Sequence, residues 1–360
     1  MTEPRTLSEF VLNERWRFIA VVGAGADGTV YLAVDEKTGE RVAIKVYDSL
    51  VGRDAASIGE RIANEIGLRA QFESPYLVRN IAHGVDRGAG GRDAGYIVME
   101  HLEGRPLRNH IDANGGRLRY TDALAITRQT AMALAALHAG SVAHLDLKPE
   151  NIFLLNADCA ARCGVTIKLL DLGAARRTDI VTASIQVRGT PTYAAPEICE
   201  RLPVIGPQAD VYGLGIMMYE LLVGAPPLQP GTPAQLVAQH VFAQLLPLPA
   251  GQEWGGLAHV YARATARQPS ERFADAAEMV AALDTLPDPS MLGTTALAGE
   301  NRAISSLEAL LPRATSTSST LTRLTTPHQV RLSPTQGATP TTGSAVTIAP
   351  VKRRDDGSRG

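Results

Sequence analysis

The stretch HLDLKPEN at residues 144–151 decides the fold, because it stands in a fixed order with three other strings. VAIK precedes it at 42–45, and DLG at 171–173 and APE at 195–197 follow it. A single aspartate in such a string could be solvent-exposed or cap a helix. Four strings in this order along one chain are a far more specific signal than any one of them.

The residues around VAIK alternate as β-strands do. RFIAVV, TVYLAV and RVAIKVY, separated by glycine-bearing turns, predict an antiparallel meander between Trp16 and Tyr47. Residues 54–72 change to helical spacing, and LVRNIAHGV and GYIVME resume strand character. The first hundred residues therefore predict a small antiparallel β lobe with one helix.

Beyond Gly104 the pattern is mostly helical. Five apolar-periodic segments lie between Pro- and Gly-bearing loops: TDALAITRQTAMALAALHAG, DVYGLGIMMYELLVG, PAQLVAQHVFAQLL, GGLAHVYARATAR and ADAAEMVAALDTL. After about residue 287 the composition becomes rich in Ser, Thr, Pro and Gly, which predicts a disordered tail. The expected organisation is an extension at 1–15, a two-lobed domain at 16–287 with lobes 16–102 and 103–287, and the tail at 288–360.

Composition excludes several classes of function. The 360 residues carry a formal net charge of −2, so no basic field indicates nucleic acid or an anionic membrane surface. The three cysteines lack metal-finger spacing, and Cys159 and Cys163 have no second pair nearby to complete a zinc site. The start MTEPRTLSEF lacks an apolar signal core, and no segment reaches about twenty uninterrupted apolar residues. We expect a cytoplasmic protein without nucleic-acid binding or membrane insertion.

The glycines of GAGADGTV at 23–30 allow a backbone to close over phosphates without Cβ obstruction. A structural hairpin turn would explain them about as often. A dinucleotide-binding loop would require a helix to follow, whereas TVYLAV is typical of a strand. The predicted phosphate-binding glycines are Gly23, Gly25 and Gly28.

In the order VAIK, HLDLKPEN, DLG and APE, the chain resembles the protein-kinase superfamily, in its serine/threonine branch and most closely the soluble kinase domains of bacteria. The resemblance covers about residues 16–287. It implies an α+β, two-lobed fold that transfers the γ-phosphate of ATP to serine or threonine hydroxyls of proteins, in bacterial signalling and with autophosphorylation.

The resemblance assigns a role to each polar residue of the four strings. Lys45 would hold the α/β-phosphates and pair with Glu65 of the predicted helix. Asp146 would be the base that accepts the substrate's proton, with Lys148 stabilising the transferring phosphoryl group. The metal ligands would be Asn151 and Asp171, binding Mg²⁺, which Mn²⁺ could replace.

The adenine site is implied in the same way. Met99 would line its back, and the Glu100 carbonyl and Leu102 amide would meet the adenine edge. The ring would lie between Val30, Ala43 and Phe153. The same residues could equally be the core of a buried strand, and apolar walls with few polar contacts are how ligand sites are built.

The segment between DLG and APE carries the expected regulatory positions. Within the family, Thr190 of this segment and Lys148 of HLDLKPEN imply serine/threonine preference. The candidate phosphorylation sites in the loop are Thr178, Thr182 and Ser184. Glu197 is expected to pair with Arg272, and Asp210 to tie the catalytic loop to the core. We also expect tail threonines to be autophosphorylated and to recruit a phosphopeptide-binding partner.

Two departures from the family pattern are visible: Leu145 replaces an arginine, and Arg69 occupies an often apolar helix position. Neither removes a phosphate, metal or base group. Two alternatives remain open: a pseudokinase that binds nucleotide as a scaffold, and a small-molecule phosphotransferase of kinase-like fold. The second normally lacks the segment from Thr190 to Glu197.

Overall fold

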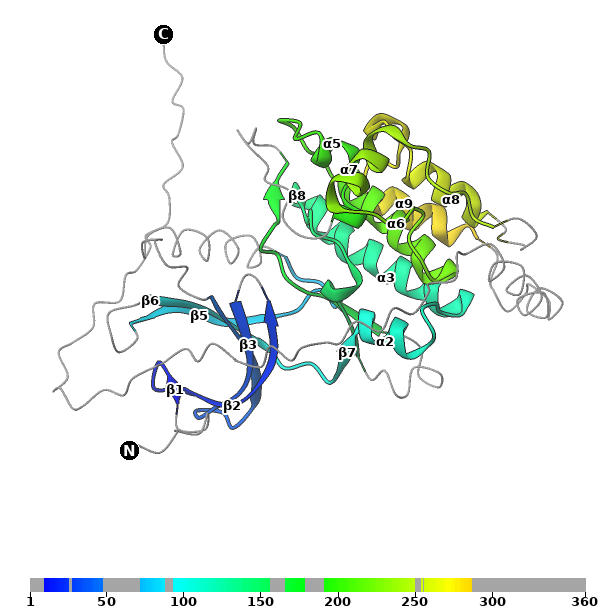
Figure 1. Ribbon diagram of the computed structural model, residues 1–360. Coiled ribbons are helices and arrows are strands. Elements are labelled where there is room, and N and C mark those ends of the chain that lie inside the picture. Colours follow the sequence, from blue (N-terminus) through cyan, green and yellow to red (C-terminus); the bar gives the residue numbers. More distant parts are fainter. Residues whose placement is uncertain are drawn as a thin grey trace, which may run out of the picture.

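The structure is a computed structural model that describes residues 10–25, 28–47, 72–87, 93–155, 166–178, 191–249, 254 and 256–286. Two lobes are evident, one built on a curled sheet and one mainly helical (Figure 1). The predicted helix at 54–72, apart from Phe72 at its end, and the tail at 288–360 lie outside the described residues.

The first lobe is a six-stranded antiparallel sheet. Its strand order is β1-β2-β3-β4-β6-β5. The strands are β1 (Val11–Leu12), β2 (Trp16–Gly25), β3 (Gly28–Asp35), β4 (Arg41–Tyr47), β5 (Asn80–Arg87) and β6 (Asp93–Glu100). The predicted meander is therefore confirmed. The strand expected to begin at Leu77 starts later, because Leu77 instead forms an isolated parallel bridge with Leu169 of the other lobe.

Side-chain alternation gives this sheet two different faces. Val42, Ile44 and Val98 point into a buried cluster with Trp16 and Phe18. On β3, β4 and β6 the alternate residues face the opposite side of the sheet. One of them, Lys45, contacts Asp171 of the second lobe. The face away from the apolar core is thus available to form a binding surface.

The second lobe contains six helices of seven or more residues in the described part of the chain. They are α2 (Leu107–Ala113), α3 (Tyr120–Ala139), α6 (Gln208–Val223), α7 (Pro233–Phe242), α8 (Leu257–Ala264) and α9 (Ala276–Asp284), of which α2 is the one that the sequence patterns did not predict. Short elements complete the lobe: β7 (Gly104–Pro106), β8 (Val142–Ala143), β9 (Ile152–Leu155), β10 (Thr166–Leu169), β11 (Arg176–Arg177), η2 (Pro149–Asn151), η3 (Pro191–Tyr193), α5 (Pro196–Cys199) and η4 (Pro269–Glu271).

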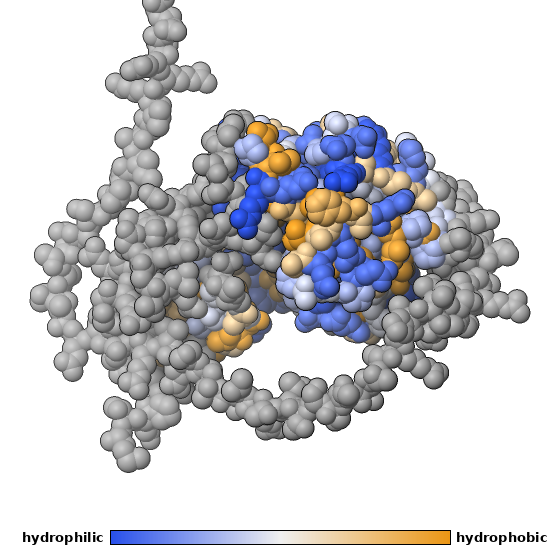
Figure 2. Space-filling view, turned by 45° about the horizontal axis from the view of Figure 1, so that its top comes forward, coloured by the Kyte–Doolittle hydropathy of each residue, from blue (hydrophilic) through white to orange (hydrophobic). Residues whose placement is uncertain are grey.

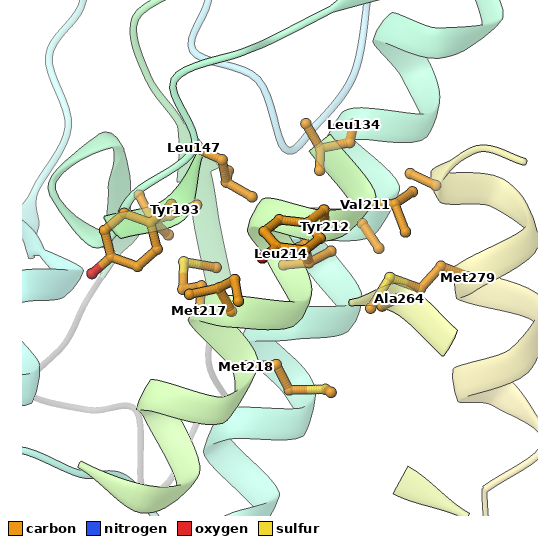
Figure 3. Close-up of a cluster of buried hydrophobic side chains, with 14 of the residues drawn as sticks. Leu134, Leu147, Tyr193, Val211, Tyr212, Leu214, Met217, Met218, Ala264 and Met279 are labelled. Carbon is orange, nitrogen blue, oxygen red and sulfur yellow. The ribbon is translucent and has the colours of Figure 1, made fainter. Parts of the chain in front are cut away.

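Helix α6 is the centre of this lobe. All residues from Ala209 to Leu222 are buried, as expected of a helix that is apolar on every side. Figure 3 shows Leu214, Met217 and Met218 of α6 among apolar side chains from the surrounding elements. The long apolar segment is therefore a core helix, as its sequence predicted.

Helix α7 begins where its sequence predicts and ends earlier. The Thr232 hydroxyl accepts a hydrogen bond from the Gln235 amide, and the Gln235 side chain accepts one from the Thr232 amide, forming a capping box. The predicted helix ran on to residue 246. Instead the Leu246 amide donates to the Pro227 carbonyl, and Pro247 disfavours a helical conformation at Leu246.

Some apolar residues lie on the surface rather than in the core. Figure 2 shows a face that is mainly hydrophilic with separate hydrophobic patches. In the part of the chain that the structure describes, no helix combines the length and apolar character needed to cross a bilayer.

Candidate active site

Four predicted nucleotide-binding residues share one face of the sheet. In the strand register Val30 lies opposite Lys45, and Ala43 lies opposite Met99. Because residues two apart on a strand point to the same side, Val30, Ala43, Lys45 and Met99 all face away from the core of the sheet lobe. The structure therefore brings these four side chains to one surface.

Lys45 is held at the junction of the two lobes. Its side chain is 10% exposed, and its Nζ lies 2.8 Å from Asp171 Oδ2. A buried ammonium requires such a partner, because losing hydration costs several kcal/mol per ion. Its predicted partner Glu65 lies outside the described residues, so that pairing stays a prediction.

Asp171 is oriented by the turn that follows β10. Its φ is +39°, an uncommon value for a residue with a Cβ, and its Oδ1 accepts a hydrogen bond of 2.9 Å from the Gly173 amide. The other carboxylate oxygen meets Lys45. The DLG string thus forms a turn that places its carboxylate beside the lysine of VAIK.

The string HLDLKPEN brings three polar side chains together. Asp146 Oδ2 accepts hydrogen bonds from Lys148 Nζ at 2.7 Å and from Asn151 Nδ2 at 3.1 Å. Asn151 Nδ2 also donates to the Asp146 carbonyl at 2.7 Å. The Leu170 amide donates to the Asn151 carbonyl, which connects this loop to Asp171.

The orientation of the Asn151 amide tests whether a metal ion fits. A carbonyl oxygen can only accept, so the atom of Asn151 that faces the Asp146 carbonyl must be the nitrogen. Both hydrogen bonds of the Asn151 side chain, to the Asp146 carbonyl and to Asp146 Oδ2, are donated by its nitrogen, so its oxygen is not used in them. An amide oxygen and the Asp171 carboxylate are hard donors of the kind that Mg²⁺ prefers, so the residues fit the implied ion.

A buried carboxylate stabilises the strained turn at the start of this loop. Leu145 has a φ of +63°, which is costly for a residue with a branched side chain. Asp210 of α6 accepts hydrogen bonds from the His144 amide at 2.7 Å and the Leu145 amide at 2.8 Å. The expected tie between Asp210 and the catalytic loop is therefore present.

Two histidines complete this support. His138 Nδ1 accepts a hydrogen bond from the Ala276 amide, so its Nε2 carries the proton and donates to Asp210 at 2.9 Å. Burial alone would raise the pKa of Asp210, but the hydrogen bond from His138 and the nearby loop amides outweigh burial and lower it. His144 Nε2 lies 3.1 Å from the Leu170 carbonyl and links the two loops again.

The predicted ion pair behind the activation segment is present. Arg272 donates to both carboxylate oxygens of Glu197, at 2.7 and 2.9 Å, and both side chains are buried. The remaining donors of Arg272 reach the Gln208, Ala266 and Arg267 carbonyls. Full satisfaction is what allows a guanidinium to remain buried.

Other predicted positions are only partly described. Thr178 donates its amide to the Ser141 carbonyl, while Thr182, Ser184 and Thr190 lie outside the described residues, as do Cys159 and Cys163. Gly25 and Gly28 are the last residue of β2 and the first of β3, and Gly23 lies within β2 opposite Val30. A Cβ at Gly28, whose φ is +142°, would clash with the Val46 carbonyl, which is a structural reason for that glycine.

The linker between the lobes, which follows β6 at residues 101–103, is preceded by a contact of Glu100 that the sequence patterns did not predict. Lys168 of β10 donates to Glu100 Oε1 at 2.9 Å and to the Leu77 carbonyl at 3.0 Å. The same carboxylate oxygen accepts the Arg79 amide at 2.8 Å. A lysine in the otherwise apolar run TIKLL was the available signal. The Glu100 side chain is thereby fixed, while Leu102 and Phe153 are half-buried beside the linker and in β9.

The match to known proteins agrees with this geometry. Residues 16–278 match the family model described as protein kinase domain, and the chain belongs to this family. It is 34% identical over 282 residues to the serine/threonine-protein kinase pkn2 of Myxococcus xanthus, covering 76% of this chain and 32% of that protein.

Two further relatives have similar coverage. The serine/threonine-protein kinase PknB of Mycobacterium leprae is 31% identical over 76% of this chain and 43% of its own length. The serine/threonine-protein kinase PrkC of Bacillus subtilis is 30% identical over 78% of this chain and 42% of its own length. The matched region thus spans less than half the length of each of these relatives.

Proposed function

We propose that the chain transfers the γ-phosphate of ATP to serine and threonine hydroxyls of proteins. The observation that carries the proposal is the convergence of Lys45 and Asp171 with the Asp146, Lys148 and Asn151 cluster. Phosphoryl transfer depends on positioning and on neutralising charge, and these side chains supply both. Bacterial relatives named serine/threonine-protein kinases support the same class of substrate.

Each side chain has a defined task in this proposal. The Asp146 carboxylate accepts the proton of the substrate hydroxyl as the hydroxyl oxygen attacks the γ-phosphorus, and the bond between the γ-phosphorus and the β,γ-bridging oxygen breaks to release ADP. Lys148 Nζ, now 2.7 Å from Asp146 Oδ2, donates to the phosphoryl oxygens as their charge develops. Lys45 positions the α/β-phosphates. Asn151 and Asp171 would hold Mg²⁺, or Mn²⁺ in its place, which supplies neutralisation of phosphate charge when bound.

The apolar surface and the linker fit a nucleotide base. Val30, Ala43 and Met99 line one face of the sheet, and Phe153 would pack against the adenine ring from the second lobe. The Glu100 carbonyl and Leu102 amide would meet the adenine edge. We also propose a role in bacterial signalling, a cytoplasmic location, autophosphorylation of the tail and a phosphopeptide-binding partner for it.

Radiolabelled ATP tests the proposal against its alternatives. We expect label in a casein-type protein and none in an aminoglycoside panel. Asp146→Asn should lower the transfer rate by roughly 10²–10⁴-fold, because it removes the base. The matched control is Glu40→Gln, the same chemical change at an exposed position whose hydrogen bond to a neighbouring side chain is made by its backbone amide.

Transfer by the Asp146→Asn protein at the rate of the control would refute the assigned base. Label in an aminoglycoside but not in casein would indicate a small-molecule phosphotransferase. Nucleotide binding without transfer to either acceptor would indicate a pseudokinase.

A further inference from the structure

Arg108 lies in a polar cluster that joins four parts of the helical lobe. From α2 its Nη2 donates to Glu220 Oε1 of α6 at 2.9 Å and to the Tyr193 hydroxyl of η3 at 3.0 Å. Its Nε donates to Glu150 Oε1 of η2 at 3.2 Å. The Tyr193 hydroxyl donates to Glu220 Oε2 at 2.5 Å. One guanidinium thus donates hydrogen bonds to two carboxylates and a phenol, and a third carboxylate, that of Asp112, lies 3.9 Å from its Nη1.

Burial separates the roles of the two glutamates. The Glu220 side chain is 6% exposed, whereas that of Glu150 is 49% exposed. Burial alone would lower the pKa of Arg108, but attraction by Glu220 and Tyr193 outweighs it, so the guanidinium stays charged. Burial, together with Glu220, raises the pKa of Tyr193, so the phenol stays neutral. Arg108 is therefore the cation that balances the buried Glu220.

The cluster borders the place where a substrate hydroxyl must meet Asp146. Glu150 follows Asp146 by four residues in the same loop, and Tyr193 lies within the activation segment, the stretch between DLG and APE, three residues after Thr190. A Cβ at Gly213 would lie 3.1 Å from the Tyr193 carbonyl and 3.7 Å from Leu147 Cβ. Figure 3 likewise shows Tyr193 and Leu147 on the same side of α6. The acidic pair is therefore next to the acceptor position.

We propose that Arg108 is a specificity-determining residue that occupies this acidic site from within the chain, so that the peptide groove does not select basic substrate residues. The inference rests on the proposed function. Two carboxylates near the base would otherwise attract an arginine of the peptide, since guanidinium and carboxylate groups pair with charge-assisted, directional hydrogen bonds. The substrate class is serine or threonine peptides that need no arginine or lysine near the acceptor.

Paired peptides test this proposal. Each peptide has one threonine as acceptor, neutral flanking residues and a fluorescent label. The two members of a pair differ at a single position, which is arginine in one and alanine in the other, and this position is varied over four residues on either side of the acceptor. Binding is measured by fluorescence anisotropy and transfer by radiolabelled ATP. For the wild type we expect the dissociation constants of the arginine and alanine peptides to differ by less than about threefold, which corresponds to a binding free-energy difference below about 1 kcal/mol.

Three variants sharpen the test. Arg108→Leu should favour the arginine peptide by about tenfold at one position or more, and Arg108→Leu with Glu220→Leu should remove most of that preference. The double variant also guards against misfolding, because it leaves no buried carboxylate unpaired. The matched control is Arg119→Leu, at an exposed arginine paired with Asp122, and it should alter the binding and the phosphorylation of neither peptide.

A wild type that prefers an arginine peptide by tenfold, and loses that preference in Glu150→Gln, would overturn the proposal. So would equal effects of Arg108→Leu on both peptides, which would assign Arg108 a structural role alone. The proposed function fails differently, by absence of transfer to every peptide and protein. The anisotropy ratio is measured without transfer and decides the question about Arg108 in that case too.

Discussion

His240 provides a pH-dependent stability that can be calculated from its surroundings. It is 3% exposed, and its Nδ1 is hydrogen-bonded to the Tyr212 hydroxyl at 2.7 Å. Burial lowers the pKa of His240 to about 4 from 6.5, although the Pro191 and Thr192 carbonyls oppose part of this shift. The unfolded chain therefore binds a proton at His240 in a pH range where the folded chain does not.

The sign and size follow from linkage. Because the folded pKa is the lower one, stability is complete above about pH 6.5 and decreases as the pH falls toward 4. The full loss is about 3 kcal/mol, since each pKa unit corresponds to 1.36 kcal/mol. Between pH 7 and pH 5 the expected loss is about 2 kcal/mol.

The measurement is urea denaturation of the wild type and His240→Asn at pH 7 and pH 5. The asparagine side chain can still form a hydrogen bond with the Tyr212 hydroxyl but does not titrate. We expect the wild type to lose about 2 kcal/mol more than the variant between these pH values. Carboxylates contribute equally to both proteins and cancel in the comparison. Equal losses, within about 0.5 kcal/mol, would refute the calculation.

Three further outcomes are expected. Arg272→Met should lower the free energy of unfolding by about 3–5 kcal/mol, measured in urea, because it leaves Glu197 buried without its cation; an unchanged midpoint would contradict this. Lys168→Met should raise the KM for ATP about threefold at little cost in kcat, because it releases the Glu100 side chain at the linker, a difference of less than 1 kcal/mol; an unchanged KM would count against it. A variant with alanine at all three loop sites should retain activity on an external substrate within about tenfold, or 1.4 kcal/mol, because Leu145 cannot bind a loop phosphate; inactivity with retained ATP binding would show that another arginine does so. The three sites are Thr178, Thr182 and Ser184.

The sequence predicted the parts of the fold that depend on local periodicity. Strand alternation around VAIK predicted the strand that carries Ala43 and Lys45, and the apolar run around Leu214 predicted a core helix; both are confirmed. Pairing of Glu197 with Arg272 came from family resemblance and is present. These features are either repeated along the chain or tied to a recognisable string.

The sequence did not predict contacts between distant residues that have no periodic signature. Arg108 is 85 residues from Tyr193 and 112 from Glu220, and no local pattern connects them. A weak signal existed, because a cation in the first turn of α2 opposes the helix dipole and so implies a tertiary partner. The pairing of Lys168 with Glu100 had no such signal beyond a charge within an apolar strand.

The two-sided register of β4 restricts the insertions and deletions that its gene can tolerate. Gain or loss of one codon within residues 41–47 would exchange the faces of every following side chain. Ile44 would then point toward the other lobe, and the Lys45 ammonium would enter the apolar cluster around Trp16 and Phe18. Length changes in the exposed turn at 36–40 leave that alternation intact. Natural length variation should therefore collect in this turn and be absent from the strand.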